Sequence, residues 1–396
     1  MAQFISIDDL QSTKNAPRKW ALFDLGFRPF FLLGSVFALL AIVPWVLSLH
    51  GIAFNPTGGG LWWHAHELIF GFALAIIFGF LLTAGQNWTG VPSASDGSLA
   101  GLVGLWLLPR VLLPFDIAPW WLMMAFDVCA GLGVAGVLAR MMIKVKQWRN
   151  LGLVAVLVML AALNAASYIS VAQGRADTAL NIHHGALLWV ALVMNIMGGR
   201  VIAFFTERGA GVTRTPEPKW LANVSSGLLI VFAIGFMFFG IESVAMRVLA
   251  GVVALVVGYR WSHWGWRASF GNPLLWSLHT SFVCLPLSLA LMALGVGVSP
   301  ALHLFTIGAM SGLILSMMSR VSLGHTGRML QTLPAMPWSY RLLILAAVLR
   351  VFAGVFPAAY LPLIDSALLA WTISWGLFVW RYAVILLRPR LDGRRG

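Results

Sequence analysis

Nine histidines in this chain of 396 residues have a spacing that suggests chemistry. Three groups of them open long apolar segments: His64 and His66 in WHAHE, His183 and His184 in IHHG, and His303 in ALHLF. His64 and His184 are 120 residues apart, and His184 and His303 are 119 apart. Neutral imidazole binds haem iron, copper and zinc through one ring nitrogen while an acceptor holds the other. We therefore expect His66, His184 and His303 to share a metal or haem centre, with His64 in that centre or a neighbouring one.

Helical geometry limits which of these histidines can bind one group. Residues two apart on an α-helix differ by about 200° in direction, so His64 and His66 face opposite ways and can serve different centres. His183 and His184 differ by about 100°. Both are candidate metal ligands, but we expect one of them to face lipid or a loop.

Other histidines need separate explanations. His325 lies 22 residues after His303, about 33 Å along one helix, so it marks an inner site or a gate. His50 and His263 fit anchors at the lipid headgroups. Anchoring and hydrogen bonding between helices are the alternative roles for the whole set, although ionisable residues inside a membrane mark functional sites by default. Anchoring is also expected of the tryptophans near segment ends, which are Trp62, Trp63, Trp88, Trp120, Trp121, Trp220, Trp261, Trp264 and Trp266.

Charged residues accompany the histidines within the apolar segments. Glu67 directly follows the HAH triplet, and Asp127 lies in the middle of a segment. Arg110 and Arg350 are candidates to bind haem propionates through the guanidinium fork, and pairing with Asp or Glu between helices is an equally open role. For proton transfer the candidates are Glu67 first, then Asp127 and Tyr168.

These residues require membrane helices to position them. Only 10% of the chain is charged and 60% is hydrophobic, whereas soluble domains carry about 25% charged residues. A spanning helix needs about 20 mostly apolar residues, and the apolar runs predict twelve spans in an all-α integral membrane protein. The predicted spans are 30–50, 64–84, 97–115, 119–141, 150–172, 181–205, 220–240, 243–260, 272–295, 301–322, 339–357 and 360–386.

Lysine and arginine positions predict the orientation of these spans. If the N-terminus lies in the cytoplasm, 22 of the 26 basic residues fall on inner segments, as the positive-inside rule requires. This predicts a multi-pass membrane protein with both termini in the cytoplasm. The net charge of +13 does not indicate nucleic-acid binding, because the basic residues are spread over many loops instead of one face. The four outer basic residues are Arg110, Arg175, Arg247 and Arg350.

The repeat of the histidine segments continues downstream. His184 is followed 16 residues later by Arg200, and His303 is followed 17 residues later by Arg320. Repeats of this kind define an architecture, so we expect three four-helix units around a pseudo-threefold axis, each contributing one histidine helix to the centre. The predicted organisation is a cytoplasmic arm at 1–29, a single membrane domain at 30–386 and a basic cytoplasmic tail at 387–396.

The sequence resembles the NnrS family of haem- and copper-associated membrane proteins linked to nitric oxide metabolism. WHAHE and GHTGR are the specific elements of the resemblance, which covers most of the chain. The matching segments are GFRPFFLLG at 26–34, WHAHELIFGF at 63–72, GFLLTAGQNWTG at 79–90, GGRVIAFFT at 198–206 and SRVSLGHTGR at 319–328. The family's histidine positions fall on His64, His66, His303 and His325, and the match of His183 and His184 is looser.

The resemblance implies protection against nitric oxide or its iron–nitrosyl products in bacteria. We expect haem b, because the chain has no CXXCH motif for covalent attachment, and copper or a second haem is a further candidate. By analogy, twelve spans with threefold pseudo-symmetry resemble the main subunits of haem–copper oxidases and nitric oxide reductases, although fold does not establish function.

Three functions remain open at this point. The first, which we favour, is an oxidoreductase of nitric-oxide-reductase type near the periplasmic side, with an unidentified electron donor. The second is a non-catalytic haem protein that senses or sequesters nitric oxide. The third is a transporter that uses the histidines as a substrate or proton pathway.

Overall fold

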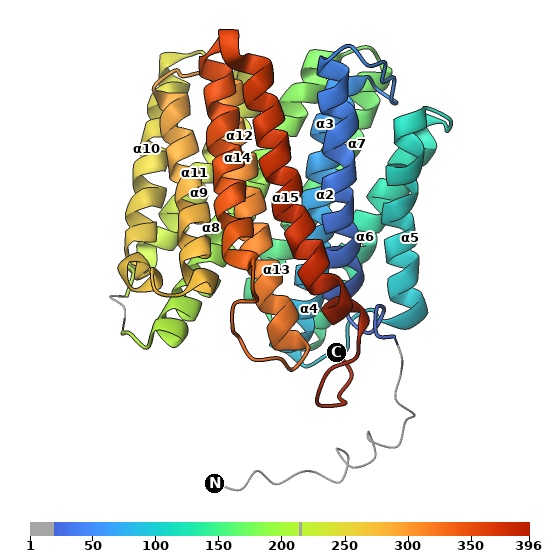
Figure 1. Ribbon diagram of the computed structural model, residues 1–396, viewed down its shortest axis with the longest axis vertical. Helices are drawn as coiled ribbons and strands as arrows, with labels where there is room; N and C mark the ends of the chain where they lie inside the picture. Colours follow the sequence, from blue (N-terminus) through green and yellow to red (C-terminus); the bar gives the residue numbers. More distant parts are fainter. Residues whose placement is uncertain (1–19, 214–215) are drawn as a thin grey trace, which may run out of the picture.

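The computed structural model describes residues 20–213 and 216–396, and these form a bundle of long helices (Figure 1). Most of the predicted N-terminal arm, residues 1–19, lies outside the described residues, as do two of the loop residues, 214 and 215. Within the described ranges twelve helical segments are long and apolar enough to cross a membrane. The predicted fold class and the number of spans are therefore confirmed.

The twelve spans agree with the predicted ones to within a few residues at each end. The sixth differs most, because it covers Ala176–Ala210 instead of 181–205. In chain order the spans are α2 (Phe27–Leu49); α3 (Gly60–His66) with η2 (Glu67–Ala73) and α4 (Leu74–Thr89); α5 (Asp96–Leu112) with η3 (Leu113–Phe115); α6 (Trp120–Lys144); η4 (Trp148–Asn150) with α7 (Leu151–Ala172); α8 (Ala176–Ala210); α9 (Lys219–Phe239); α10 (Val244–Ser262); α11 (Pro273–Ala293); α12 (Val298–His303) with η6 (Leu304–Ser311) and α13 (Gly312–His325); α14 (Met336–Val355); and η7 (Pro357–Ala359) with α15 (Tyr360–Leu387).

Local sequence explains several of the helix boundaries. α4 and α8 end at Gly90 and Gly211, whose φ angles of 67° and 65° suit a residue without a Cβ atom. α10 begins after Ser243, whose hydroxyl accepts a hydrogen bond from the Met246 amide at 3.2 Å. α11 begins at Pro273, a residue that fits the first helical position because its missing N–H has no partner there.

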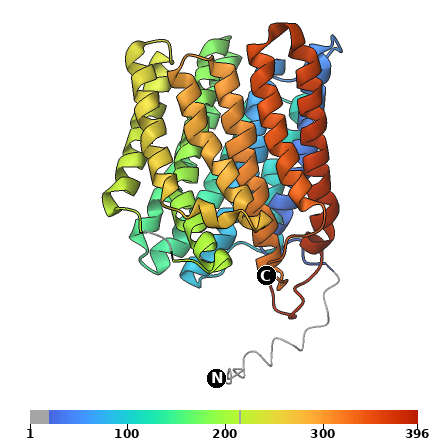
Figure 2. The ribbon, with the colours of Figure 1, turned by 60° about the vertical axis from the view of Figure 1, so that its left-hand side comes forward.

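The first and last spans close the bundle, since α2 packs along α15 and α15 along α14 (Figures 1 and 2). The Ala21 amide donates to the Leu387 carbonyl at 2.9 Å, so both ends of the described chain lie at one end of the bundle. We call this the lower end, as in Figure 1, and the opposite one the upper end. At the upper end His50 pairs with Asp365 at 2.8 Å, which joins α2 to α15.

The three histidine-headed spans are among the most buried ones. In the second, sixth and tenth spans, 78%, 61% and 67% of the most apolar window is buried, against 33–50% in every other span except α11. α8 contacts α3 and η2 on one side and η6 on the other. The three spans therefore meet inside the bundle, whereas the predicted pseudo-threefold relation between four-helix units stays a prediction.

Two of these three spans contain a π-helical stretch that starts directly after a histidine. η2 follows His66, and η6 follows His303. The sixth span, α8, is α-helical throughout. Such stretches are rare and are frequently found at functional sites. His66 and His303 are therefore equivalent in position relative to the π-helical stretch of their spans. The near-equal spacing along the chain had instead indicated that His64 is the equivalent of His303.

The close approach of α2 to α4 depends on Gly79. A Cβ atom at this position would lie 2.9 Å from Phe30 Cβ and 3.2 Å from the Phe27 Cα atom. We expect Gly79→Ala to reduce the free energy of unfolding by about 1–3 kcal/mol, because the backbones must separate. Gly101→Ala is the matched control, since nothing lies within 4 Å of its Cβ position. Thermal unfolding in detergent should separate the two variants; equal melting temperatures would contradict the assigned contact.

Candidate functional site

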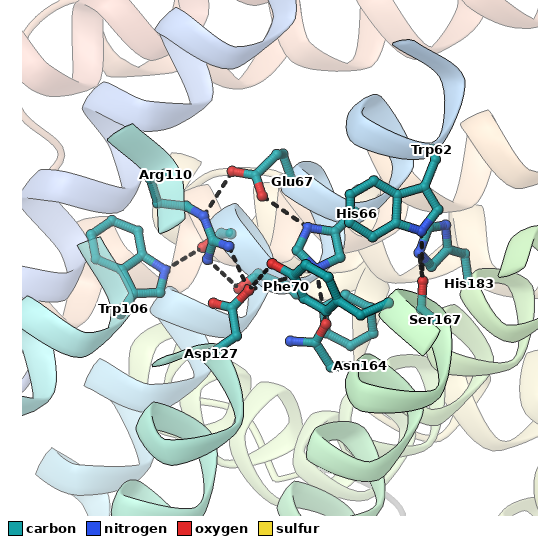
Figure 3. A network of polar contacts seen from close by, with 12 residues as sticks. Trp62, His66, Glu67, Phe70, Trp106, Arg110, Asp127, Asn164, Ser167 and His183 are labelled. Atoms are coloured by element: carbon teal, nitrogen blue, oxygen red, sulfur yellow. Dashed lines mark hydrogen bonds and ion pairs between the residues drawn. The ribbon is translucent and has the colours of Figure 1, made fainter. Parts of the chain in front are cut away.

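Four ionisable side chains from three spans form one buried group, which we call the ion cluster (Figure 3). His66 and Glu67 come from the second span, Arg110 from α5 and Asp127 from α6. None of the four is more than 5% exposed. Arg110 Nε lies 2.7 Å from Glu67 Oε2, and its NH2 nitrogen lies 2.8 Å from Asp127 Oδ2. One guanidinium therefore neutralises two carboxylates that belong to different helices.

His66 uses both ring nitrogens within the protein. Nδ1 lies 2.8 Å from Glu67 Oε1, and Nε2 lies 2.8 Å from the Asn164 amide oxygen and 3.7 Å from Asp127 Oδ2. The Trp62 ring stacks on the imidazole with ring centres 4.5 Å apart. A metal ligand needs one free nitrogen, and this imidazole has none. In this arrangement both nitrogens of His66 are engaged by protein acceptors, and the expected role as a ligand stays a prediction.

The proton count of the ion cluster decides its charge. Arg110 contributes one positive charge, and Glu67 and Asp127 contribute one negative charge each when ionised. The cluster is neutral when the His66 ring carries two protons and has a charge of minus one when it carries one. Unbalanced charge inside a membrane is costly. Loss of the second proton from the His66 ring would therefore leave the surrounding helices with an uncompensated negative charge.

Hydrogen bonds extend the ion cluster towards the fifth and sixth spans. The Tyr168 hydroxyl donates to Asp127 Oδ2 at 2.8 Å. The Ser167 hydroxyl accepts from Trp62 Nε1 at 2.8 Å and lies 2.6 Å from His183 Nε2. His183 is buried, and its Nδ1 atom has no hydrogen-bond partner among the described residues. Side chains from five successive spans, the second to the sixth, thus meet in one polar network.

The third span also supplies hydrogen-bond donors to backbone carbonyls of η2, the π-helical stretch of the second span. A π turn displaces carbonyl groups from their usual partners, and in lipid each must find another donor. Trp106 Nε1 donates to the Gly71 carbonyl at 2.8 Å, and Arg110 NH1 lies 3.5 Å from the Phe70 carbonyl oxygen. α5 therefore supplies both the cation of the ion cluster and a donor for the altered backbone beside it.

A second group, the histidine pair, consists of His64 and His303. Their rings are nearly parallel, with an interplanar angle of 11° and centres 6.4 Å apart. Trp45 stacks on the other face of His64 at 4.9 Å. His303 Nδ1 lies 2.7 Å from the Ser299 carbonyl oxygen. Because a carbonyl can only accept, Nδ1 carries the ring proton and the lone pair is on Nε2, the tautomer found in metal-bound histidines.

The dimensions of the histidine pair suit one metal ion between two imidazoles. Metal–nitrogen bonds of about 2.0–2.1 Å place two such ring centres about 6 Å apart, close to the 6.4 Å separation here. His64 Nδ1 is buried without a hydrogen-bond partner among the described residues. Arg350 donates through NH2 to Ser299 Oγ at 3.0 Å, and its NH1 is buried without a partner in the same part of the chain. The site therefore offers two nitrogen ligands and one cation.

The constellation expected of His66, His184 and His303 is not formed. His66 contacts His183, with ring centres 6.1 Å apart, and His303 stacks with His64. His184 lies against Phe236 of α9, with centres 5.6 Å apart. The reason is rotational: equal spacing along the chain does not give equal direction when two of the three helices contain π turns. His66 thus belongs to the ion cluster and His303 to the histidine pair, whereas His184 belongs to neither.

His325 lies at the lower end of the bundle, far from the histidine pair. Its ring packs on Phe27 with centres 5.7 Å apart, and Nε2 is 3.4 Å from Asn87 Nδ2. Arg390 donates to its backbone carbonyl at 3.0 Å. The surroundings join three chain segments and do not form a second cluster of histidines.

Some functional neighbours were missed or misassigned from sequence. Trp62 was expected to anchor at the headgroups, yet it is 6% exposed and packs on His66. Ser167 and Ser299 carry no sequence signal, because serines are common as helix-packing residues. A tryptophan four residues before a histidine lies on the same helix face, and this spacing between Trp62 and His66 is the one signal that could have identified Trp62.

Removing the cation of the ion cluster should be severely destabilising. Arg110→Met leaves two carboxylates buried without a partner, which typically costs about 3–5 kcal/mol. Neutralising them as well, in Arg110→Met/Glu67→Gln/Asp127→Asn, should recover much of that loss. Arg247→Met is the control, because its partner Glu242 is 82% exposed and surface pairs contribute little. Membrane expression and melting temperature are the readouts, and equal values for the two single variants would rule out the assigned charge balance.

Comparison with known proteins supports the resemblance seen in the sequence. The chain matches the family described as NnrS protein over residues 21–390, which include the ion cluster, the histidine pair and both π-helical stretches. No curated protein matches the chain. Membership of this family implies a role in nitric oxide metabolism for a protein with twelve candidate membrane spans. Because the match extends over nearly the whole described chain, the protein belongs to the NnrS family.

Proposed function

We propose that this protein binds a b-type haem at the histidine pair and reduces nitric oxide there. The observation that carries the proposal is the contact of His303 Nδ1 with the Ser299 carbonyl, which leaves Nε2 free to bind a metal, in a ring that lies 6.4 Å from the ring of His64. Haem needs only one or two protein ligands, because the porphyrin supplies four. This suits a site where no group of three or more His, Cys, Asp or Glu in the described residues could hold a metal.

The residues of the pair would have different tasks. His303 is fixed by its backbone hydrogen bond and suits the permanent ligand. His64 has no partner at Nδ1 and is held by stacking on Trp45, which suits a ligand that gives way to nitric oxide. Arg350 has an unpartnered NH1 that can pair with a propionate group. The bound haem would supply an iron that holds nitric oxide and passes electrons to it.

The ion cluster would supply protons to this chemistry. Reduction of two nitric oxide molecules to N2O and water consumes two electrons and two protons. His66 and Glu67 follow His64 by two and three residues in the same span, Asp127 contacts them through Arg110, and this arginine balances their charge. We further propose that the upper end faces the periplasm, since among the described lysines and arginines only Arg110, Arg175, Arg247 and Arg350 belong to the upper half of the spans. The electron donor is unidentified, and copper or a second haem is an additional candidate cofactor.

A second function is favoured by one observation. No hydrogen bond or ion pair among the described residues links the ion cluster to the histidine pair, and the cluster is almost completely buried. A site closed to protons binds nitric oxide without turning it over, as in a protein that senses or sequesters it. Formation of N2O by the purified protein distinguishes the two functions. Transport is less favoured, because the second, sixth and tenth spans continue as helix along their whole described length.

The haem proposal predicts unequal effects of histidine substitution. His303→Ala should lower the haem content per protein more than tenfold, and His64→Ala should change the spectrum of the bound haem. His66→Gln should retain haem, because that ring has no free nitrogen, and His263→Ala is a surface control. Pyridine haemochrome content and oxidised and dithionite-reduced spectra provide the measurement. Absence of Soret absorption from haem-replete wild-type protein, or full loading in His303→Ala, would exclude this ligand.

The proton-supply proposal predicts a kinetic effect without a loss of cofactor. Glu67→Gln has nearly the shape of the native side chain but cannot exchange a proton, so N2O formation should fall by about 100-fold or more. Tyr168→Phe should cause a smaller decrease, since Tyr168 only donates to Asp127. Glu242→Gln is the exposed control. Rates are measured with a reduced dye and compared at equal haem loading and melting temperature; an unchanged rate in Glu67→Gln would remove Glu67 from the proton route.

A further inference from the structure

An internal cavity of about 100 Å³ lies where the second, sixth and tenth spans meet. α4 contributes Ile76 and Phe80, and α8 contributes Val193 and Met197. The tenth span contributes Met310, with Leu313 below it. None of the lining residues is classed as exposed. The space therefore lies between the three histidine-headed helices, beside Phe31 of the first span, and is partly open instead of fully enclosed.

The lining of the cavity excludes water as its stable occupant. Every lining side chain is aliphatic, aromatic or a methionine, apart from Gly198, which has no side chain. A buried water needs two to four polar partners, and apolar cavities of comparable size remain dry and bind xenon or small hydrocarbons. The cavity is thus suited to molecules that are small and apolar.

The size of the cavity limits the class of ligand further. A water-sized molecule needs about 10–15 Å³ of probe-occupied volume, so a space of about 100 Å³ accommodates more than one diatomic molecule. Pockets for drug-sized ligands are about 300–1,000 Å³. A haem therefore exceeds the volume, whereas a diatomic gas fits.

The cavity lies further along the same helices that carry His66 and His303. Ile76 follows His66 by ten residues and Met310 follows His303 by seven, which correspond to about 15 Å and 10 Å along a helix. Both residues lie at or just past the end of a π-helical stretch, η2 in one span and η6 in the other. An extra residue in a turn rotates the helix below it by about 100° relative to an uninterrupted α-helix. The two stretches thus give a local reason why the three helices do not interdigitate completely here.

We propose that this cavity is a binding site for a small apolar gas, and that in the cell it holds nitric oxide below the histidine pair. The identity of the gas rests on the proposed function, whereas the site itself rests on the volume, lining and burial of the cavity. Nitric oxide dissolves in lipid and needs no polar channel to enter the bundle. A store of two molecules would serve a reaction that consumes two.

Xenon tests the site independently of haem. The full-length protein in detergent is titrated with xenon and followed by 129Xe NMR. We expect a saturable shift for the wild type that is lost in Val193→Phe, whose added ring fills the space, and retained in Val231→Phe, which changes a lipid-facing residue that is 57% exposed. Ile314→Trp fills the cavity from the tenth span and is used if Val193→Phe does not fold.

The outcomes separate this proposal from the proposed function. Saturable xenon binding that both filling variants abolish supports the cavity site, even if the wild type contains no haem. Haem binding with no saturable xenon signal, or with a signal that persists in both filling variants, overturns the cavity site and leaves the histidine pair intact. A detergent or lipid chain that remains bound in the cavity and prevents xenon from entering also overturns it.

Discussion

Charge balance around Arg110 is the constraint on which the upper half of the bundle depends. Its guanidinium bridges Glu67 and Asp127, so it joins the second and fourth spans through the third. In a region without water, none of the three charges is tolerated alone. The same side chain lies beside the altered carbonyls of the π stretch. Arg110 therefore affects the helix backbone at η2, the ionic balance of the cluster and the orientation of His66 together.

The division of the histidines changes how the site is understood. One imidazole, His66, is engaged at both nitrogens and belongs to an ionic group, whereas His303 is held at one nitrogen and keeps the other free. Within the second span, His64 and His66 lie two residues apart, and each belongs to a different group. Under the proposed function, the haem site and its proton supply would be neighbours without sharing side chains.

The number of spans and their approximate bounds were predicted well from the sequence, and the physical reason is that apolar run length is a property of single segments. The predicted ends of the spans were less accurate, as in α8, because helices can extend beyond the hydrocarbon region. The near-equal offsets related His64 to His303, but the direct contact of their two rings was not predictable, since it depends on helix packing and on π turns that no residue pattern in η2 or η6 indicates. Arg110 was singled out with two roles left open, because Glu67 and Asp127, which it contacts, are 43 and 17 residues away along the chain.

The side chains of the ion cluster all come from the first half of the chain, and this has a consequence for biosynthesis. Membrane proteins are inserted from the N-terminus as they are made, and the second to fourth spans are complete by Lys144. Arg110, Glu67 and Asp127 can therefore neutralise one another while the later spans are still being translated. The histidine pair instead requires the tenth span, which begins at Val298. A nascent chain would thus carry a charge-balanced core long before it could retain any ligand held by both His64 and His303.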